Sequence, residues 1–341
     1  KNYFVKYKFL INLYFYYKIK LKNKKYYAII KTKIRYMVKN KNLTVRFLQI
    51  KGGYVVAYVI GDYNRKGGVG KTSSIINIAC QMALEGKRVL LIDGDSQMNL
   101  SQFFFEEDDT IFNPDTGKIR EGVDTLYETL EEDLNIFNVI QTKEYSARRK
   151  WKNKFKKIGL KIDVVLGSSD MDYYGPDEDS IDILRKKLDL LDGFYDYIFI
   201  DFPPAHNLVT MMYLVACDYI IVPMHLAKGS SINGYFDVID KCKEARKEYG
   251  NKNLRVLGLF YINVQMYKND QSSTWNESKE DGTKDELEMF DTLIRHDYRS
   301  TQISELNQSP VCICCPSSDV SEDYSHLAKE IEKRIKKQRG E

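Results

Sequence analysis

The sequence predicts an α/β fold in which a mostly parallel, twisted sheet of about eight strands is flanked by helices on both faces. From residue 54 onward, short β-rich apolar runs alternate with longer amphipathic stretches, which is typical of strands that pair in parallel through helical crossovers. A glycine-rich segment lies between the first apolar run and the first amphipathic stretch, as in phosphate-binding folds of this class. The 341 residues are 43% hydrophobic, which is enough for one large core.

Six apolar runs are predicted to be buried strands because each is short, β-rich and bounded by Gly, Asp, Asn or Pro. They are residues 54–60, 89–92, 162–166, 197–200, 219–222 and 256–262. The helices predicted among them have apolar residues at helical spacing, and the first three stop at a glycine. They are residues 72–84, 181–191, 235–249 and 324–337.

The N-terminal tract differs from the rest of the chain. Residues 1–36 consist almost wholly of Lys, Tyr, Asn, Ile, Phe and Leu and end just before Met37. The first 52 residues hold 15 basic and no acidic side chains, so the remainder carries 37 basic and 48 acidic ones, a net charge of −11. The tract is interpreted either as a stretch outside the native protein, which then starts at Met37, or as a basic aromatic arm for nucleic acid or an anionic membrane. The folded domain is expected at residues 53–341.

Two polar stretches, near residues 106–121 and 268–286, are predicted to be surface insertions in this domain. The six cysteines show no even spacing, so a reducing cytoplasm is expected rather than a disulfide framework. Cys312 and Cys315 form a C-x-x-C within a predicted strand, where small buried side chains are expected rather than zinc ligands. The longest uncharged apolar run near the N-terminus, residues 9–17, is too short to span a membrane. No integral membrane contact is expected.

A phosphate-binding loop is predicted at residues 66–73, K-G-G-V-G-K-T-S. A loop between a strand and a helix can direct backbone N–H groups at phosphate oxygens, and glycine allows the close approach and positive φ that this requires. The expected nucleotide contacts are the whole segment: Lys66, Gly67, Gly68, Val69, Gly70, Lys71, Thr72 and Ser73.

Two side chains of the loop have distinct expected roles. Lys71 would reach the β- and γ-phosphates of ATP, and the Thr72 hydroxyl would bind Mg²⁺. The common pattern G-x-x-x-x-G-K-[ST] places its first glycine where this chain has Arg65. The loop is therefore the deviant form, which carries a second lysine, Lys66.

This loop resembles that of the ParA/MinD class of P-loop ATPases, and the likeness extends along the chain. Residues 89–101, VLLIDGDSQMNLS, are similar to the family segment V-L-L-I-D-x-D-P-Q-x-N-x-[ST]. Residues 195–204, YDYIFIDFPP, resemble Y-D-x-I-I-I-D-x-P-P, and residues 218–223 and 294–305 resemble the segments that follow. The matches run from about residue 54 to 337 in the family's order. The resemblance implies a P-loop NTPase fold and, most closely, a ParA/Soj-type partition ATPase.

Three aspartates follow predicted strands near the loop. Asp201 ends a strand predicted to lie beside the phosphate loop and would hold Mg²⁺ through a water. The alternative is a helix N-cap or turn residue, and the two prolines that follow disfavour it because they forbid an immediate helix. A carboxylate near the attacking water can orient it or take its proton. By resemblance Asp95 is the hydrolytic residue, while Asp93 supports it or the metal. The family's proline after Asp95 is Ser96 here.

The resemblance also implies that Lys66 reaches across a two-fold interface to the partner's phosphates, which would make ATP the glue of a homodimer and Lys66 part of the catalytic set. Asn263 stands where this family often places an adenine-contacting amide. Arg299 and Lys268 fall at or near positions that contact the DNA backbone in ParA-type members. The alternative for each of these basic residues is a solvated surface charge.

The function implied by the resemblance is that of a cytoplasmic, nucleoid-associated bacterial ATPase with weak intrinsic activity. ATP would close the dimer, the dimer would bind nonspecific DNA, and a ParB-like centromere-binding protein would trigger hydrolysis and release. The alternative is a MinD-like membrane-surface positioning ATPase, whose last helix would be amphipathic. Here Leu327, Ile331 and Ile335 recur at four-residue spacing before a polar end, so packing of this helix on the body is expected.

Overall fold

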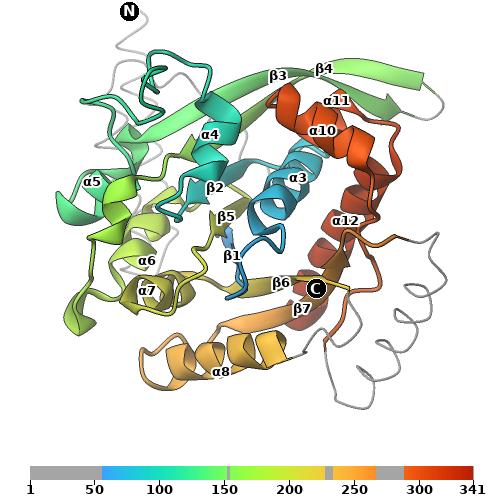
Figure 1. The fold of residues 1–341 in the computed structure, drawn as a ribbon. Helices are drawn as coiled ribbons and strands as arrows, with labels where there is room; N and C mark the ends of the chain where they lie inside the picture. The colour runs from blue at the N-terminus through green and yellow to red at the C-terminus, as the bar shows by residue number, and fades with distance from the viewer. Residues whose placement is uncertain (1–55, 152–153, 227–232, 266–287, 341) are drawn as a thin grey trace, which may run out of the picture.

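The computed structural model describes residues 56–151, 154–226, 233–265 and 288–340 (Figure 1). Seven strands of this part form one sheet in the order β3-β4-β2-β5-β1-β6-β7. Every neighbouring pair is parallel except β3 with β4. The strands are β1 (Tyr58–Asp62), β2 (Val89–Asp93), β3 (Ile140–Trp151), β4 (Lys154–Val165), β5 (Tyr197–Asp201), β6 (Tyr219–His225) and β7 (Arg255–Ile262).

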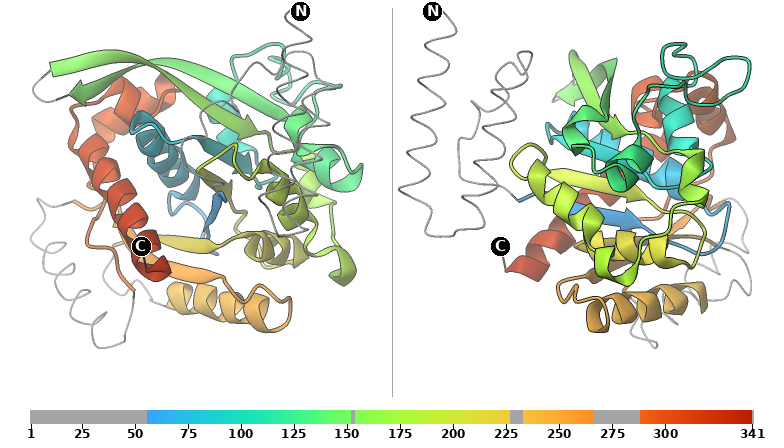
Figure 2. Two further views of the ribbon diagram at one scale, coloured as in Figure 1. Left: turned by 180° about the vertical axis from the view of Figure 1, so that it is seen from behind. Right: turned by 90° about the vertical axis from the view of Figure 1, so that its left-hand side faces the viewer.

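Helices cover both faces of this sheet, as Figure 2 shows. One face is packed against α3 (Lys71–Leu84), α4 (Asn99–Phe105), α11 (Val311–Cys314) and α12 (Asp319–Arg339), with α10 (Tyr298–Leu306) beside α11. The other face is packed against α5 (Leu126–Glu131), α6 (Ile183–Leu188), α7 (Leu208–Ala216) and α8 (Asn233–Lys247). Short 3₁₀ turns occur at Ile136–Asn138, Ser169–Asp172, Glu178–Ser180 and Asp189–Leu191. The predicted α/β class with a mostly parallel sheet is confirmed.

The central strands are buried along their whole length. Every residue of β2 and β5 is buried, which explains why they appear in the sequence as continuous apolar runs and not as alternating patterns. In α12 the side chains of Leu327, Ile331 and Ile335 are 0%, 0% and 1% exposed and pack in the α3 face of the core. The expected packing of the last helix on the body is therefore confirmed.

Several predicted elements have different bounds. The first strand starts at Tyr58 and not at residue 54, and the last helix begins at Asp319, five residues earlier than predicted. The run predicted at residues 162–166 is the end of the much longer β4. The prediction that Cys312 and Cys315 lie in a strand is wrong, because Pro310 is followed by the short helix α11.

All six cysteines are free, as expected for a chain without a disulfide framework. Residues 106–121 form turns in which only Ile111 and Phe112 are buried, in keeping with a surface insertion. The second predicted insertion, residues 268–286, lies outside the described residues. In the described ranges, no helix combines the length and the apolar character that crossing a bilayer requires.

Candidate nucleotide site

The glycine-rich loop lies between the end of β1 and the start of α3, as predicted. Gly68 and Gly70 have φ of +70° and +74°, a region that L side chains rarely adopt. A Cβ on Gly70 would lie 2.2 Å from the Cδ1 of Ile262, so this position also lacks room for a side chain. No side chain caps the N-terminus of α3, and its first N–H groups therefore point toward a place suited to an anion.

Two residues outside the predicted set hold this loop on the sheet. The buried Asn64 donates from Nδ2 to the carbonyl of Pro223 on β6 and accepts from the backbone N–H of Lys66, both at 2.9 Å. His225 Nε2, at the end of β6, lies 2.9 Å from the carbonyl oxygen of Gly68. The loop is thus anchored at both of its halves to the neighbouring strand. The signal for Asn64 in the sequence was its position two residues before Lys66 at the start of the loop.

The two lysines of the loop lie in different environments. Lys71 is only 8% exposed, and its Nζ lies 3.5 Å from the carbonyl oxygen of Lys66. The side chain of Lys66 is exposed. One lysine is therefore enclosed by its own loop, whereas the other faces outward from it.

Three aspartates lie side by side at the carboxyl ends of adjacent strands. Asp201 on β5 pairs in register with Asp93 on β2 and with Asp62 on β1. Asp62 and Asp201 are 0% and 1% exposed, and the four oxygens of their carboxyl groups have no hydrogen-bond partner among the described residues. Burial, and next the nearby Asp93, raise the pKa of Asp201 to about 8. Burial and the neighbouring Asp201 likewise raise the pKa of Asp62 well above its ordinary value.

Asp62 was missed in the sequence analysis. The signal was present, since an acidic residue interrupts an apolar strand directly before the loop. Buried carboxyl groups without partners are costly unless a cation or a proton neutralises them.

Asp93 and Asp95 are held by the segment that follows β2. Asp93 accepts from the N–H of Ser101 at 2.8 Å and from its hydroxyl at 2.6 Å, and burial raises its pKa to about 6. Asp95 is 9% exposed and accepts from the N–H of Gln97 at 3.0 Å. Burial raises the pKa of Asp95 as well. Gly94 between them is required, because a Cβ there would lie 2.7 Å from the carbonyl oxygen of Asp201.

A cavity of about 620 Å³ opens along this edge of the sheet. Its lining brings together the loop, Asp95 and a wall from the C-terminal part of the chain: Gly67, Gly68, Gly70, Lys71, Thr72, Ser73, Asp95, Pro204, Asn263, Thr301, Glu305 and Tyr324. This volume and this set of donors fit a nucleotide. Over the described ranges, the aspartates do not converge as a metal-ligand set of their own. Carboxylate and hydroxyl oxygens are nevertheless ligands that Mg²⁺ prefers, and the unpartnered Asp201 with Thr72 fits a cation shared with a nucleotide.

Two of the three remaining predicted residues, Asn263 and Arg299, belong to the described part of the chain. Asn263 lines the cavity, has φ +57° and places its Oδ1 3.2 Å from His296 Nδ1. Arg299 is exposed in the first turn of α10. Lys268 lies outside the described residues. Arg295, which the sequence analysis did not single out, lines the same cavity and is held by ion pairs to Asp323 at 2.7 Å and Asp319 at 3.0 Å.

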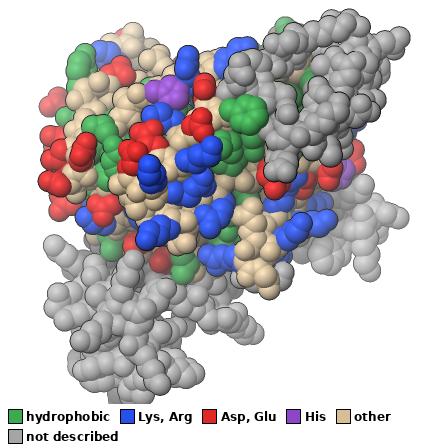
Figure 3. All heavy atoms as spheres, turned by 90° about the horizontal axis from the view of Figure 1, so that it is seen from below, with side chains coloured by type: hydrophobic (Ala, Val, Ile, Leu, Met, Phe, Trp, Pro, Cys, Tyr) green, Lys and Arg blue, Asp and Glu red, His purple; other side chains and the backbone are tan. Residues whose placement is uncertain are grey.

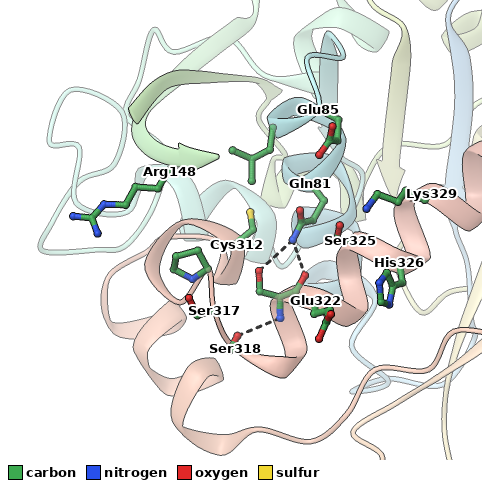
Figure 4. Close-up of a pocket in the computed structure, with 13 residues that line it drawn as sticks. Gln81, Glu85, Arg148, Cys312, Ser317, Ser318, Glu322, Ser325, His326 and Lys329 are labelled. Carbon is green, nitrogen blue, oxygen red and sulfur yellow. Dashed lines mark hydrogen bonds between the residues drawn. The ribbon is translucent and has the colours of Figure 1, made fainter. Parts of the chain in front are cut away.

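A second cavity of about 620 Å³ lies between α3, α12 and the β3–β4 hairpin (Figure 4). Gln81 donates there to the carbonyl oxygen of Ser321 at 2.7 Å. The lining contains no glycine loop and none of the predicted site residues. The chemistry expected from the sequence is thus concentrated in the cavity at the end of β1.

Comparison with known proteins agrees with this geometry. The family described as an AAA domain, AAA_31, matches residues 57–256. The chromosome partitioning protein ParA of Myxococcus xanthus is 25% identical over 287 residues, covering 83% of this chain and 91% of that protein.

Two solved structures have the same fold. A cobyrinic acid a,c-diamide synthase from Mycobacterium smegmatis with bound ATP analog and magnesium superposes with a TM-score of 0.61 at 18% identity, over 82% of this chain and 96% of that one. A putative plasmid partition protein from Borrelia burgdorferi bound to AMPPNP gives a TM-score of 0.59 at 20% identity, over 82% and 99%. Together with the loop, the aspartates and the family match, these findings show that the chain belongs to the AAA_31 family of ParA/Soj/MinD-type P-loop ATPases.

Proposed function

We propose that this chain is an ATP-dependent DNA-partition ATPase that forms an ATP-sandwich dimer, binds nonspecific DNA and is switched off by hydrolysis that a ParB-like partner stimulates. Family membership and the partition proteins among its relatives support this function. The replicon it moves would be a plasmid or a chromosome.

The observation that carries the proposal is the different placement of the two lysines. Lys71 is enclosed by its own loop and is suited to the phosphates within one subunit. The side chain of Lys66 is exposed, although its backbone is fixed by Asn64. An exposed lysine on a rigid loop can reach a nucleotide in a second copy of the chain, and a nucleotide bound between like subunits stabilises their association.

The roles of the other residues follow from their positions. Mg²⁺, when bound, would neutralise phosphate charge, and Thr72 with Asp201 would hold it. Asp95 lies in the wall of the cavity with a raised pKa, which suits a group that orients a water or takes its proton. Asp93 would keep this segment in place through Ser101. Asn263 would contact the adenine, and Arg299 with Lys268 would contact the DNA backbone.

The membrane-surface alternative lacks a free amphipathic face in the last helix. The apolar residues of α12 are buried against α3, so they are not available to a bilayer in this structure. Their burial favours the partition function.

The first experiment separates nucleotide binding from dimerisation. We expect Asp95→Ala to bind ATP and remain dimeric, because the carboxylate acts on the water and not on the phosphates. Lys66→Ala should bind ATP and stay monomeric. Light scattering with and without ATP measures this, with the exposed Lys118→Ala as the control. A monomeric Asp95→Ala protein or a dimeric Lys66→Ala protein would contradict these roles.

A further inference from the structure

The β3–β4 hairpin is much longer than its place in the sheet requires. Both strands have twelve residues and pair along their whole length, from Ile140↔Val165 to Trp151↔Lys154. Only the last part of β4 pairs with β2, at residues 163–165. The rest is a two-stranded ribbon that runs over α10 and α11 and ends beyond them (Figures 1 and 2).

The first half of this ribbon is fixed to the body by its inner face. Ala147 and Leu160 are 1% and 4% exposed, and the Tyr145 hydroxyl donates to the carbonyl oxygen of Gln308 at 3.0 Å. The Lys143 ammonium lies 5.6 Å from the ring centre of Phe105. Packing of this kind gives the far half of the hairpin a firm base.

The far half concentrates positive charge. Among strand residues 148–151 and 154–157, six are Lys or Arg and none is acidic. Arg148 lies opposite Lys157, and the next pair along the ribbon is Arg149 with Lys156. Like charges directly opposite each other destabilise an antiparallel pair. We therefore call residues 148–151 and 154–157 the basic arm.

Two basic side chains of this arm, Arg148 and Lys157, are described. Arg148 and Lys157 are exposed, and within the described part of the chain neither has an ion-pair partner. Arg148 lies at the rim of the cavity in Figure 4, where its guanidinium extends away from Gln81 and the other labelled side chains. Closer to the body, on the same outer face, Lys161 is paired with Glu144. Among the described side chains of the ribbon, Lys161 is thus ion-paired and Arg148 and Lys157 are not.

Some lysines of the body do form ion pairs. On α8, Lys241 pairs with Glu244 at 2.7 Å and Lys243 pairs with Asp240 at 2.8 Å. On the face seen from below, basic side chains gather in the middle and acidic ones lie mostly to one side of them (Figure 3). The like charges that the register places opposite each other raise the free energy of the hairpin, and an anionic partner that neutralises them would offset this cost.

We propose that the basic arm is a DNA-binding element that lies against the duplex backbone and enters the major groove. The proposal rests on the partition function proposed above and adds a surface to it. A two-stranded β-ribbon fits into a major groove, which is about 12 Å wide. The four residues of each strand make the arm about 13 Å long. Contacts of Lys and Arg with phosphates are independent of sequence, as nonspecific binding requires.

The test uses the full-length chain and a fluorescently labelled duplex of random sequence, with ATP and Mg²⁺. The arm variant is R148Q/R149Q/K156Q/K157Q, and R148Q/K157Q is its milder form. The matched control removes the same charge from exposed lysines of α12, K329Q/K333Q/K336Q/K337Q. Each phosphate contact contributes about 0.9 to the slope of log K against log salt, so the loss of four contacts in the arm variant should flatten the slope by about 3.6 and weaken binding at least about 100-fold. Dimerisation and ATP affinity should stay unchanged, and thermal stability should not fall.

The outcomes separate this proposal from the one on which it rests. If the unaltered protein binds no duplex with ATP, the partition function fails and the arm proposal with it. If the unaltered protein binds DNA and the arm variant binds equally well, or the control variant loses as much, the arm proposal alone is wrong. An arm variant that keeps its DNA affinity but no longer sediments with anionic phosphatidylserine vesicles would assign the arm to a membrane, and so overturn the proposal.

Discussion

Asp62, Asp93 and Asp201 place three buried carboxyl groups at neighbouring strand ends, and this arrangement makes stability depend on pH. The ordinary pKa of 3.8 rises to about 8 for Asp201 and to about 6 for Asp93. Between the ordinary pKa and the raised one, each of these carboxyl groups is protonated in the folded protein and ionised in the unfolded chain, so the folded state binds more protons. The stabilisation is fully present below about pH 4 and is lost as the pH rises through 6 and 8.

We therefore expect the nucleotide-free protein to lose thermal stability between pH 5 and pH 8, measured by the unfolding midpoint in a series of buffers. Asp201→Asn should flatten this dependence, because an amide has no proton to lose. The exposed Asp115→Asn is the matched control and should leave it unchanged. A midpoint that rises over this range in the unaltered protein would show that the carboxyl groups are ionised in the fold.

Within the phosphate loop, the stability of the fold depends more on glycine at position 70 than on glycine at position 67. We expect Gly70→Ala to lower the free energy of unfolding by about 1–3 kcal/mol, since it combines positive φ with a clash against Ile262. Gly67→Ala should change stability little, because a Cβ there meets no heavy atom within 4 Å. Denaturant unfolding compares the two variants, and equal losses would contradict this view of the loop.

Some elements of this structure could be predicted from the sequence and others could not. Buried strands and the helix after the loop were predictable because apolar periodicity and terminal glycines depend on local chemistry. The hairpin was not predictable, because its far half is charged on both strands and has no apolar pattern. Its register also depends on pairs that lie far apart in the chain, up to the 25 positions between Ile140 and Val165. The aspartates Asp93 and Asp201 were predictable from motif and strand end, whereas Asp62 and His225 act at the site through the sheet register and the β6 edge.

At the scale of the whole molecule, charge is divided between segments. The chain after residue 52 has a net charge of −11, so DNA binding requires a local basic surface and its presentation by a dimer. The 11 basic residues before Met37 would supply nonspecific affinity of their own. A protein that begins at Met37 removes this contribution.

The measurement that tests the central claim most directly is binding of that shorter protein to a random-sequence duplex, with ATP, without nucleotide, and with Lys66→Ala in the presence of ATP. We predict retention of the duplex only for the unaltered protein with ATP, with an affinity that falls steeply as salt is raised, because each phosphate contact releases a counterion. Arg299→Ala should weaken binding to all sequences alike. An ATP-loaded dimer that retains no duplex at low salt, yet sediments with anionic vesicles, would contradict the partition function and favour the membrane-surface alternative.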